Sequence, residues 1–459
     1  KKIDWLPIWG EVRISNMIEG REDWCISRQR AWGVPIPVFY AENHEPILDP
    51  EVLAHVSNLF KAHGSDIWYE KEANDLLPTG FTHPGSPNGL FRKETDIMDV
   101  WFDSGTSHAI LEARGVPYPA DLYLEGSDQY RGWFNSSLIT GVSAHGQAPY
   151  KQVVSHGFVL DGQGRKMSKS LGNTVDPLKI MSQQGADLLR LWVATVDYQS
   201  DVRISNETMV QISEGYRKIR NTFKFMLGNL DGFDLNKDYV VIKERKAIHR
   251  VMAESYYQIQ NHVLDAYDRY QFDRVYRIIM PFIINELSAF YLDFTKDILY
   301  IERRDDHERL SVQSTIYDIL TSLLKLLTPI IPHTTSEAYH MLPSRGEADV
   351  YLEYMPKPYD AFDKKELDAF LTFMEIREVV YKRLEEAREQ KLIGKSLQAC
   401  VGLSVTEKDK EALARLDVNL KQALIVSRVD LTVAHVRGAT IDVAQGQNCD
   451  RCWNIVDHI

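Results

Sequence analysis

The chain has 459 residues, which corresponds to about two to four domains of ordinary size. A composition of 44% hydrophobic and 26% charged residues excludes a mainly disordered or low-complexity protein. Lys and Arg total 53 against 65 Asp and Glu, so the formal net charge is −12 and nucleic-acid binding would require local basic patches. No stretch approaches the ~20 apolar residues that span a bilayer, so we expect no membrane partner.

The first part of the chain, up to about residue 200, alternates short apolar runs with helical patterns, as in an α/β protein. Helices are predicted after Asp49-Pro50 and, through Trp133, after Asp128. The near-continuous apolar character of the strand candidates suits strands that are buried on both faces. These candidates are residues 34–40, 96–102, 121–125 and 151–155.

From about Asn206 the pattern changes to long helices. Apolar residues recur at spacings of three and four in 275–298 and again in 310–327, and Pro329 and Pro332 end the second helix. Several such helices without intervening strands indicate an α-helical bundle.

A further, heavily charged helix is predicted at 364–390. Short strand-like segments return at 401–405 and 429–433, which predicts a small mixed module at the end of the chain.

The most informative segment is DGQGRKMSKSLGN, residues 161–173. Its first two glycines predict a tight, mobile turn, and Arg165, Lys166 and Lys169 place three cations within five residues. Such a loop can close over a polyphosphate and place ammonium groups where charge develops at a displaced phosphate. The alternative is a solvated basic hairpin tip, because most charge runs are solvated.

The KMSKS string follows a predicted strand and precedes a helix start at Asp176, and it resembles the second signature motif of class I aminoacyl-tRNA synthetases. Further stretches, in the same order, resemble the bacterial isoleucine-specific branch of that family: residues 16–40, 95–109, 124–138 and 153–177. The valine- and leucine-specific branches share the KMSKS loop but differ around the GSDQ stretch.

The resemblance implies a fold class that is α/β and then all-α. Residues 1–20 would be the end of an editing insertion with its connection, and 21–205 the second half of a Rossmann-type catalytic domain with the KMSKS loop. Residues 206–395 would form the helical anticodon-binding domain. Residues 396–459 would form a small α+β module with the start of a truncated zinc knuckle. We expect no editing activity, because no Thr-rich editing motif is present.

The first signature motif of the family, HIGH, is absent from the sequence. An initiator Met and a signal-peptide pattern are absent as well. We therefore expect the sequence to be part of a longer enzyme and the chain alone to be inactive.

The stretch LEGSDQ, residues 124–129, follows a predicted strand, and ligands of open α/β sheets bind at such strand ends. The resemblance implies that it contacts the aminoacyl-adenylate, and that His156-Gly157 lies near the adenine. Alternatively, Asp128 is a helix N-cap and His156 a packed structural histidine. The resemblance assigns catalysis to Lys166 and Lys169. It assigns ATP and adenylate binding to Glu125, Gly126, Asp128, Gln129, His156, Gly157, Met167, Ser168 and Lys169.

Two tryptophans, Trp101 and Trp133, match residues that line the pocket for the branched side chain of the amino acid in the isoleucine-specific branch. The alternative is plain core packing. An apolar pocket rejects larger side chains but separates valine from isoleucine poorly, a limit for which the isoleucine enzymes are the standard example.

The helical region carries basic or mixed clusters at 216–224, 243–250 and 304–310. Such clusters could follow an RNA backbone on an otherwise acidic protein, and the alternative is solvated helix faces.

Four cysteines, Cys25, Cys400, Cys449 and Cys452, are too sparse for a secreted disulfide framework and favour a cytoplasmic location. Only Cys449 and Cys452 have a spacing that suggests chemistry, because a C-x₂-C pair can share one structural Zn²⁺. Structural zinc needs four ligands, and His458 is the sole further candidate nearby. We therefore expect a severed site with weak zinc binding and a poorly ordered tail over the last ~15 residues.

The function implied by the resemblance is ATP- and Mg²⁺-dependent activation of L-isoleucine and its transfer to tRNA(Ile), by a monomer. Two alternatives remain: a non-catalytic tRNA-binding fragment of such an enzyme, or the valine-specific relative. A nucleotidyltransferase that shares the superfold is disfavoured by the helical bundle and the GSDQYRGWF stretch.

Overall fold

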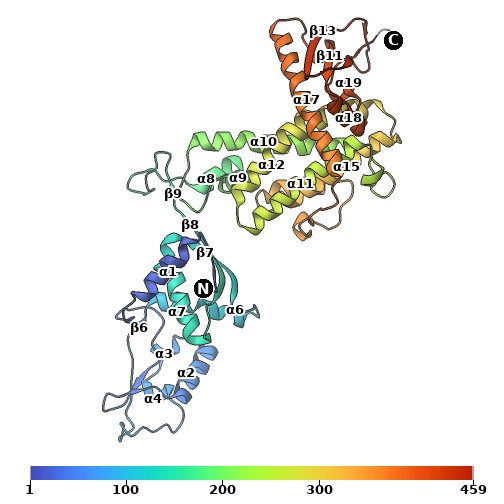
Figure 1. Cartoon of the computed structure of the whole chain (residues 1–459). Helices are drawn as coiled ribbons and strands as arrows, with labels where there is room; N and C mark the ends of the chain where they lie inside the picture. Colours follow the sequence, from blue (N-terminus) through green and yellow to red (C-terminus); the bar gives the residue numbers. More distant parts are fainter. Residues whose placement is uncertain (1, 457–459) are drawn as a thin grey trace. The chain divides into compact units, whose positions relative to one another are not determined.

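The computed structural model describes residues 2–456 and divides into two compact units (Figure 1). Unit 1 consists of Lys1–Val159 and Tyr198–Val202, and unit 2 of Leu160–Asp197 and Arg203–Ile459. The KMSKS loop therefore belongs to the same unit as the helical region, and the GSDQ stretch to the other unit.

Unit 1 is built on a parallel sheet in the order β1 (Asp4–Leu6), β8 (Tyr150–His156), β7 (Ala120–Gly126). The predicted strands at 121–125 and 151–155 are thus confirmed. Helices α1 (Trp9–Glu19) and α7 (Trp133–His145) belong to this unit, with a core that includes buried Trp5, Tyr123, Phe134, Tyr150 and Val153.

Strand β7 corrects the expectation of burial on both faces. Leu122 and Leu124 are 37% and 55% exposed, whereas Tyr123 between them is buried. Neighbouring side chains of a strand point to opposite faces, so one face of β7 is open to solvent in this chain.

The predicted strands at 34–40 and 96–102 are too long. Only β3 (Phe39–Tyr40) forms in the first, where Pro35 and Pro37 lack the N–H that a sheet ladder needs. The second contains β6 (Ile97–Met98) and then helix α5 (Val100–Gly105), because the Asp99 carboxylate accepts the N–H of Trp101 at 3.1 Å and caps that helix.

A second hydrophobic core of unit 1 lies around α2 (Pro50–His63), α3 (Ile67–Glu70) and α4 (Ala73–Leu76). A small antiparallel sheet in the order β4 (Pro46–Ile47), β3, β5 (Arg92–Lys93) packs into it through Phe39 and Ile47. Helix α2 begins as predicted, since Asp49 accepts the N–H of Glu51 at 2.7 Å and Pro50 occupies the first helical position.

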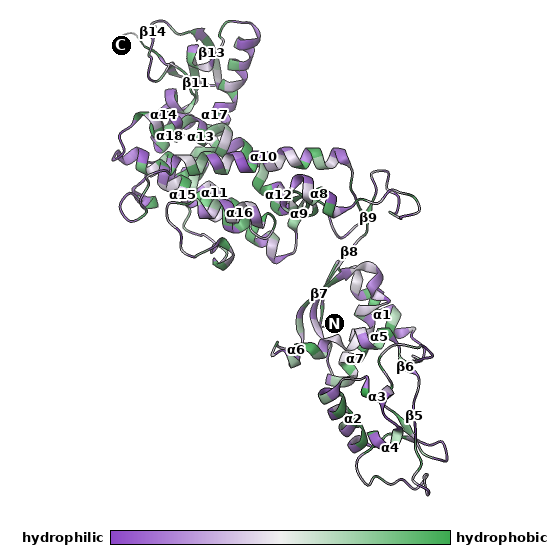
Figure 2. Cartoon of the chain, turned by 180° about the vertical axis from the view of Figure 1, so that it is seen from behind, coloured by the Kyte–Doolittle hydropathy of each residue, from purple (hydrophilic) through white to green (hydrophobic). Residues whose placement is uncertain are grey.

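Unit 2 contains the predicted bundle of long helices. Its main elements are α9 (Ala186–Thr195), α10 (Asn206–Asn229), α11 (Ala247–Asp268), α15 (His307–Leu327), α16 (Pro332–His340) and α17 (Lys364–Glu389). Hydrophilic and hydrophobic residues alternate along α10, as expected for a helix with one face in the core (Figure 2). Asp187 of α9 caps α16, because it accepts the backbone N–H and the hydroxyl of Thr334 at 2.7 and 2.6 Å.

One helical run of unit 2, Phe272–Ile301, is long and apolar enough to cross a membrane, which corrects the statement that no stretch approaches this length. It consists of α12 (Phe272–Pro281), a π-helical segment (Phe282–Tyr291), α13 (Leu292–Phe294) and α14 (Lys296–Ile301). Ile279, Ile283 and Leu287 are at most 1% exposed, so the run is a core helix of the bundle.

The module that follows α17 is mixed, as predicted. Strand β11 (Ala399–Val405) lies between the parallel β12 (Arg428–Val433) and the antiparallel β13 (Gly438–Val443), and α18 (Glu407–Leu416) packs against α17. Arg437 holds the module to the bundle, because its guanidinium contacts both Asp409 and Glu375.

Candidate active site

The carboxyl ends of β7 and β8 bring together residues that are 30 positions apart in the sequence. Gly126 lies directly opposite His156 in the register of the two strands. A Cβ atom at Gly126 would lie 2.7 Å from Asp128 Oδ1 and 3.6 Å from His156 Cε1. The absence of a side chain at Gly126 therefore leaves room beside these two polar groups, at the edge where ligands of parallel sheets bind.

Asp128 is not a helix N-cap, so this alternative is wrong. The short 3₁₀ helix Ser127–Tyr130 begins without a side-chain cap, and α7, whose N-cap position is Gly132, also begins without one. The Asp128 carboxylate instead accepts the Gln129 amide N–H at 3.2 Å and is exposed. Its acceptor capacity is therefore largely available to a ligand.

His156 is half-buried at this edge. Its Nδ1 lies 2.8 Å from the carbonyl oxygen of Gly157, and since a carbonyl only accepts, Nδ1 is the donor. The neutral ring then presents Nε2 as an acceptor. Position 157 requires a glycine for a packing reason, because a Cβ there would lie 2.3 Å from the backbone of Ser200.

Gln129 organises the candidate pocket for the amino acid. Its Oε1 accepts the N–H of Trp133 at 2.9 Å, and a Cβ at Gly132 would meet both Gln129 Oε1 at 2.4 Å and Trp101 Cη2 at 2.7 Å. A glycine at 132 thus lets the Trp101 indole approach the turn. The structure brings Trp101, Gln129 and Trp133 together.

The two tryptophans differ, because Trp101 is not plain core packing whereas Trp133 packs against the core of unit 1. Trp101 is 43% exposed, whereas Trp133 is half-buried and stacks on Tyr123, with ring centroids 4.0 Å apart at 8°. The Trp133 indole donates to Ser104 O at 3.0 Å and lies 3.1 Å from Ser107 Oγ. A stacked, hydrogen-bonded indole beside an exposed one can form the walls of an apolar pocket.

Asp99 positions Trp101 and was missed by the sequence analysis. It accepts from the Trp24 indole at 3.0 Å and from Arg28 Nη2 at 2.6 Å in addition to capping α5. Burial opposes ionisation of Asp99, but these donors and the Trp101 N–H together hold its pKa below the usual value. An Asp before a short apolar run is the signal that could have revealed it.

The KMSKS loop follows β9 (Val159–Leu160) in the chain and precedes α8 (Pro177–Gln184), whose N-cap is the predicted Asp176. The predicted tight turn is present: Gly164 has φ +78° and donates its N–H to Asp161 O at 2.9 Å. The positive φ favours a glycine at this position, and a Cβ there would also lie 3.0 Å from the end of the Arg203 side chain.

The side chain of Asp161, 7% exposed, closes this turn. Its Oδ1 accepts the backbone N–H groups of Gln163 and Arg165 at 3.0 and 2.8 Å, and its Oδ2 accepts Arg165 Nε and Asn173 Nδ2, both at 2.9 Å. The Asn173 amide and the Arg165 N–H groups hold the pKa of Asp161 far below its usual value. Arg165 is therefore paired within the loop.

The two lysines of the loop differ from Arg165. Within the described range 2–456, the ammonium groups of Lys166 and Lys169 have no hydrogen-bond or ion-pair partner, and both residues are exposed. Met167 and Ser168 are half-buried, and Ser168 Oγ lies 3.1 Å from Ser170 Oγ. The loop thus presents two uncommitted cations on a hydrogen-bonded turn.

Most cations of the basic cluster at 243–250 are paired, which corrects the expectation of a free basic surface; only Lys243 is exposed without an ion pair among the described residues. Arg245 is 2% exposed and donates to Asp318 Oδ2 at 2.7 Å. Arg250 forms a bidentate ion pair with the Glu366 carboxylate. Lys246 pairs with Glu308. Arg245, Lys246 and Arg250 thus contact residues of α15 and α17, although the Lys246 side chain remains 43% exposed.

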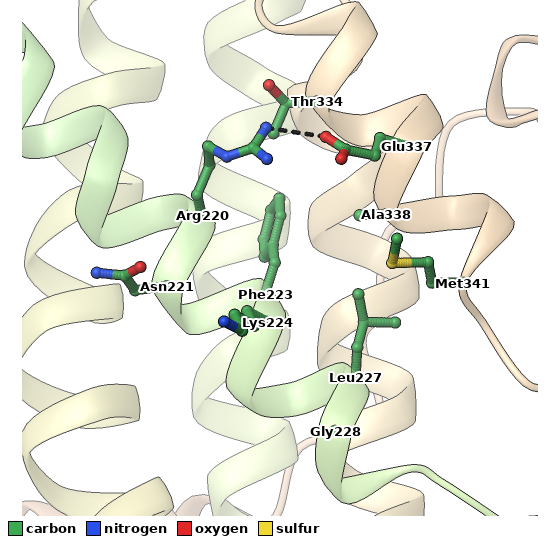
Figure 3. A pocket seen from close by; sticks show the side chains of 10 residues that line it. All are labelled: Arg220, Asn221, Phe223, Lys224, Leu227, Gly228, Thr334, Glu337, Ala338 and Met341. Atoms are coloured by element: carbon green, nitrogen blue, oxygen red, sulfur yellow. Dashed lines mark hydrogen bonds and ion pairs between the residues drawn. The ribbon is translucent and has the colours of Figure 1, made fainter.

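The cluster at 216–224 lies on α10 and is different. Arg217, Lys218 and Lys224 are exposed and have no charged partner in the part of the chain that the structure describes. Beside them, α10 and α16 enclose a cavity of about 440 Å³ with Phe223 at its base and the Arg220–Glu337 ion pair at its rim (Figure 3). An RNA contact on α10 remains compatible with this geometry.

Cys449 and Cys452 lie in a tight turn between β14 (Gln447–Asn448) and β15 (Ile455–Val456). Backbone N–H groups of Cys452 and Arg451, and the Cys452 thiol, lower the pKa of Cys449, which suits a metal-binding thiolate. No group of three or more metal-ligating side chains occurs among residues 2–456, and His458 lies outside them. Zinc binding stays a prediction.

The expected poor order of the last ~15 residues stays a prediction, but their described part makes contacts with the rest of unit 2. Arg451 donates to Ile301 O at 2.6 Å, and Ser427 Oγ accepts the N–H of Ile455 at 2.7 Å. These contacts tie the cysteine turn to the bundle and to the mixed module.

Comparisons with known proteins identify the family. Residues 1–205 match the model of class I tRNA synthetases (I, L, M and V), and residues 249–404 match the anticodon-binding domain of tRNA ligases. Residues 1–205 are therefore a class I tRNA synthetase segment, and residues 249–404 are a segment of an anticodon-binding domain.

Within this class the chain is similar along its whole length to isoleucine–tRNA ligases. It is 55% identical to that of Acholeplasma laidlawii over 461 residues, covering 100% of this chain and 51% of the relative. It is 53% identical to that of Geobacillus kaustophilus, covering 100% of this chain and 52% of the relative. The chain thus spans about half the length of the curated relatives it matches.

A solved structure supports the fold. The LeuRS of Agrobacterium radiobacter K84 agnB2, in a ternary complex with tRNA and LeuAMS, superimposes with a TM-score of 0.55 at 17% identity. The match covers 93% of this chain and 54% of that one. The predicted fold class, a class I catalytic segment followed by a helical anticodon-binding domain, is confirmed.

Proposed function

We propose that this chain supplies the KMSKS part of an isoleucine–tRNA ligase, which activates L-isoleucine with ATP and transfers it to tRNA(Ile). The observation that carries the proposal is the loop at 161–173, whose Lys166 and Lys169 stay uncommitted while Arg165 is paired. The similarity of the whole of this chain to about half of the isoleucine–tRNA ligases supports the choice of amino acid.

In the first step the carboxylate of isoleucine attacks the α-phosphorus of ATP in line, and pyrophosphate leaves. No side-chain nucleophile is required, because the substrate is itself the nucleophile. Lys166 and Lys169 bind the phosphates and stabilise the charge that develops on the departing pyrophosphate. Mg²⁺ bound to the ATP phosphates would supply further charge neutralisation.

In the second step a ribose hydroxyl at the end of tRNA attacks the carbonyl of the adenylate, and AMP leaves. Glu125, Asp128 and Gln129 offer the acceptors and the amide that hold the adenylate at the sheet edge, and His156 offers Nε2. Trp101 and Trp133 form the apolar walls for the branched side chain. The cytoplasmic location and the monomeric state predicted from the sequence stay predictions.

The test is isoleucine-dependent ATP–pyrophosphate exchange by a chimera in which this chain replaces the matching half of the Acholeplasma laidlawii isoleucine–tRNA ligase. Exchange that requires isoleucine supports the proposal, and the chain alone should give none. Exchange supported better by valine would favour the valine-specific alternative, and a folded chimera without exchange would contradict the proposal.

A non-catalytic, tRNA-binding role is the second candidate, and the exposed cations of α10 favour it. It predicts that the chain alone binds tRNA and that the chimera shows no exchange above background.

A further inference from the structure

We propose that Asp161 and Asn173 form a clasp that positions the KMSKS loop. Their side chains fix the backbone of Lys166–Ser168 and withdraw Arg165 from the ligand, so that the two lysines alone face a polyphosphate. That the loop binds a polyphosphate rests on the proposed function, whereas the clasp itself does not. Asp161 and Asn173 are positioning residues in this account, because they act through the loop.

Asn173 acts like a strand partner for the loop. Its Oδ1 accepts the N–H of Ser168 at 2.9 Å, and its Nδ2 lies 3.2 Å from the carbonyl oxygen of Lys166. One side chain thereby holds the backbone on both sides of Met167. Because Lys166 and Ser168 flank this point, the direction of the Lys166 side chain follows from the position of Asn173.

Asp161 connects the two ends of the loop. Its Oδ2 accepts Asn173 Nδ2 at 2.9 Å across 12 residues of sequence, and the same oxygen accepts Arg165 Nε at 2.9 Å. A carboxylate that accepts four N–H groups is a strong anchor, since hydrogen bonds to charged groups are about twice as strong as neutral ones.

The clasp also gives the three cations of the loop different roles. Arg165 is neutralised by Asp161 in the absence of any ligand, whereas Lys166 and Lys169 have no partner among residues 2–456. A loop that left all three cations free would repel itself and spread into many conformations. Pairing one cation and anchoring the backbone reduces the ordering that phosphate binding must supply.

Opening of the loop can be measured by trypsin digestion, because trypsin cleaves after Arg165, Lys166 and Lys169. Cleavage requires local opening of the loop, so its rate measures the clasp on the chain as it exists. Losing a hydrogen bond to a charged group corresponds to about a tenfold shift in the opening equilibrium. We expect Asp161→Asn and Asn173→Asp each to raise the cleavage rate by about this factor.

The exchange of both residues is the decisive variant. In Asp161→Asn/Asn173→Asp an amide again faces a carboxylate, but the Arg165 pair and the contact with Lys166 O are not restored. We therefore expect the double variant to be cleaved clearly more slowly than the two single effects combined would give. Asp176→Asn, which changes an equivalent carboxylate that caps α8 just after the loop, is the matched control and should leave loop cleavage unchanged. The melting temperature of each variant separates a loss of the clasp from a loss of overall stability.

A second measurement links the clasp to its function. Inorganic tripolyphosphate should slow cleavage of the loop in the original chain, and the two single variants should need about tenfold more of it for the same protection. Lys169→Ala should lose protection without a change in the basal cleavage after Lys166. If tripolyphosphate protects no variant, the phosphate-binding role in the proposed function is wrong, while the basal rates still decide the clasp.

The clasp is overturned by either of two results. One is a basal cleavage rate that is unchanged in both single variants. The other is a double variant that is cleaved as fast as the two single effects combined, because that would show that the two side chains act independently.

Discussion

Two segments of this chain look alike in sequence and do opposite things in the structure. Residues 165–169 and 243–250 each concentrate cations, as RKMSK and KERKAIHR. In the first, Lys166 and Lys169 are exposed and unpaired within the range 2–456, and in the second, Arg245, Lys246 and Arg250 are held by Asp318, Glu308 and Glu366. The difference lies in acidic partners that are 60 to 120 positions away in the sequence.

The comparison shows that the density of cations in a segment does not indicate its role. A cation contributes to ligand binding when the fold leaves it without a partner, and to stability when the fold buries it with one. The KMSKS loop contains cations of both kinds, because Arg165 is paired with Asp161, four residues away, whereas Lys166 and Lys169 are not paired among residues 2–456.

The largest effect that tests this comparison concerns the buried pair. Asp318→Ala should lower the free energy of unfolding by about 3–5 kcal/mol, because Arg245, with a fully buried side chain, keeps its charge and loses its partner. Chemical denaturation of the chain measures this. Arg217→Ala on the exposed face of α10 is the control and should change stability by less than about 0.5 kcal/mol. Equal effects of the two substitutions on stability would contradict the distinction between paired, buried cations and exposed ones.

A smaller effect concerns His249, which is completely buried in the same cluster. Burial lowers the pKa of His249 in the folded chain. Below a pH of about 6.5, the pKa of histidine in the unfolded chain, the unfolded chain therefore binds a proton that the folded chain does not bind. Stability should therefore fall as the pH falls, by about 1–2 kcal/mol between pH 7 and pH 5. His249→Gln removes this titration, and the same pH dependence in that variant would show that His249 is not the cause.

The smallest effect concerns the exposed cations of α10. If they contact an RNA backbone, Lys218→Ala should reduce the slope of log affinity for tRNA against log salt concentration by about 1. Lys246→Ala, whose charge is already paired with Glu308, should leave the slope unchanged. Filter binding of tRNA to the chain at several salt concentrations measures both, and equal slopes would remove α10 from the proposed interface.

Much of the fold was predictable, because it depends on local patterns. The apolar periodicity at 310–327, the Asp-Pro pairs before α2 and α8, and the apolar runs that became β7 and β8 are short-range signals. The strand predicted at 96–102 was wrong in its second half, because the Asp99 side chain caps a helix there. A single capping residue can start a helix within an apolar run that otherwise favours a strand.

The candidate site was predictable only in part. The meeting of Gly126 and His156 follows from two parallel strands whose ends share an edge. The approach of Trp101 to Gly132 and the Asp161–Asn173 contact depend on tertiary packing and on side-chain direction, which have no periodic signature. The pairing of Arg245 with Asp318 is of the same kind, and this is why the segment at 243–250 was misinterpreted as a surface.

The measurement that tests the account most directly compares one lysine from each segment in the chimera described above. Lys169→Ala should lower isoleucine-dependent ATP–pyrophosphate exchange by about 100-fold with an unchanged melting temperature, because it removes a cation from the transition state. Lys246→Ala should leave exchange within about twofold and lower the melting temperature, because it removes only an ion pair between α11 and α15. The reverse pattern, or an equal loss of exchange in both variants, would contradict the account.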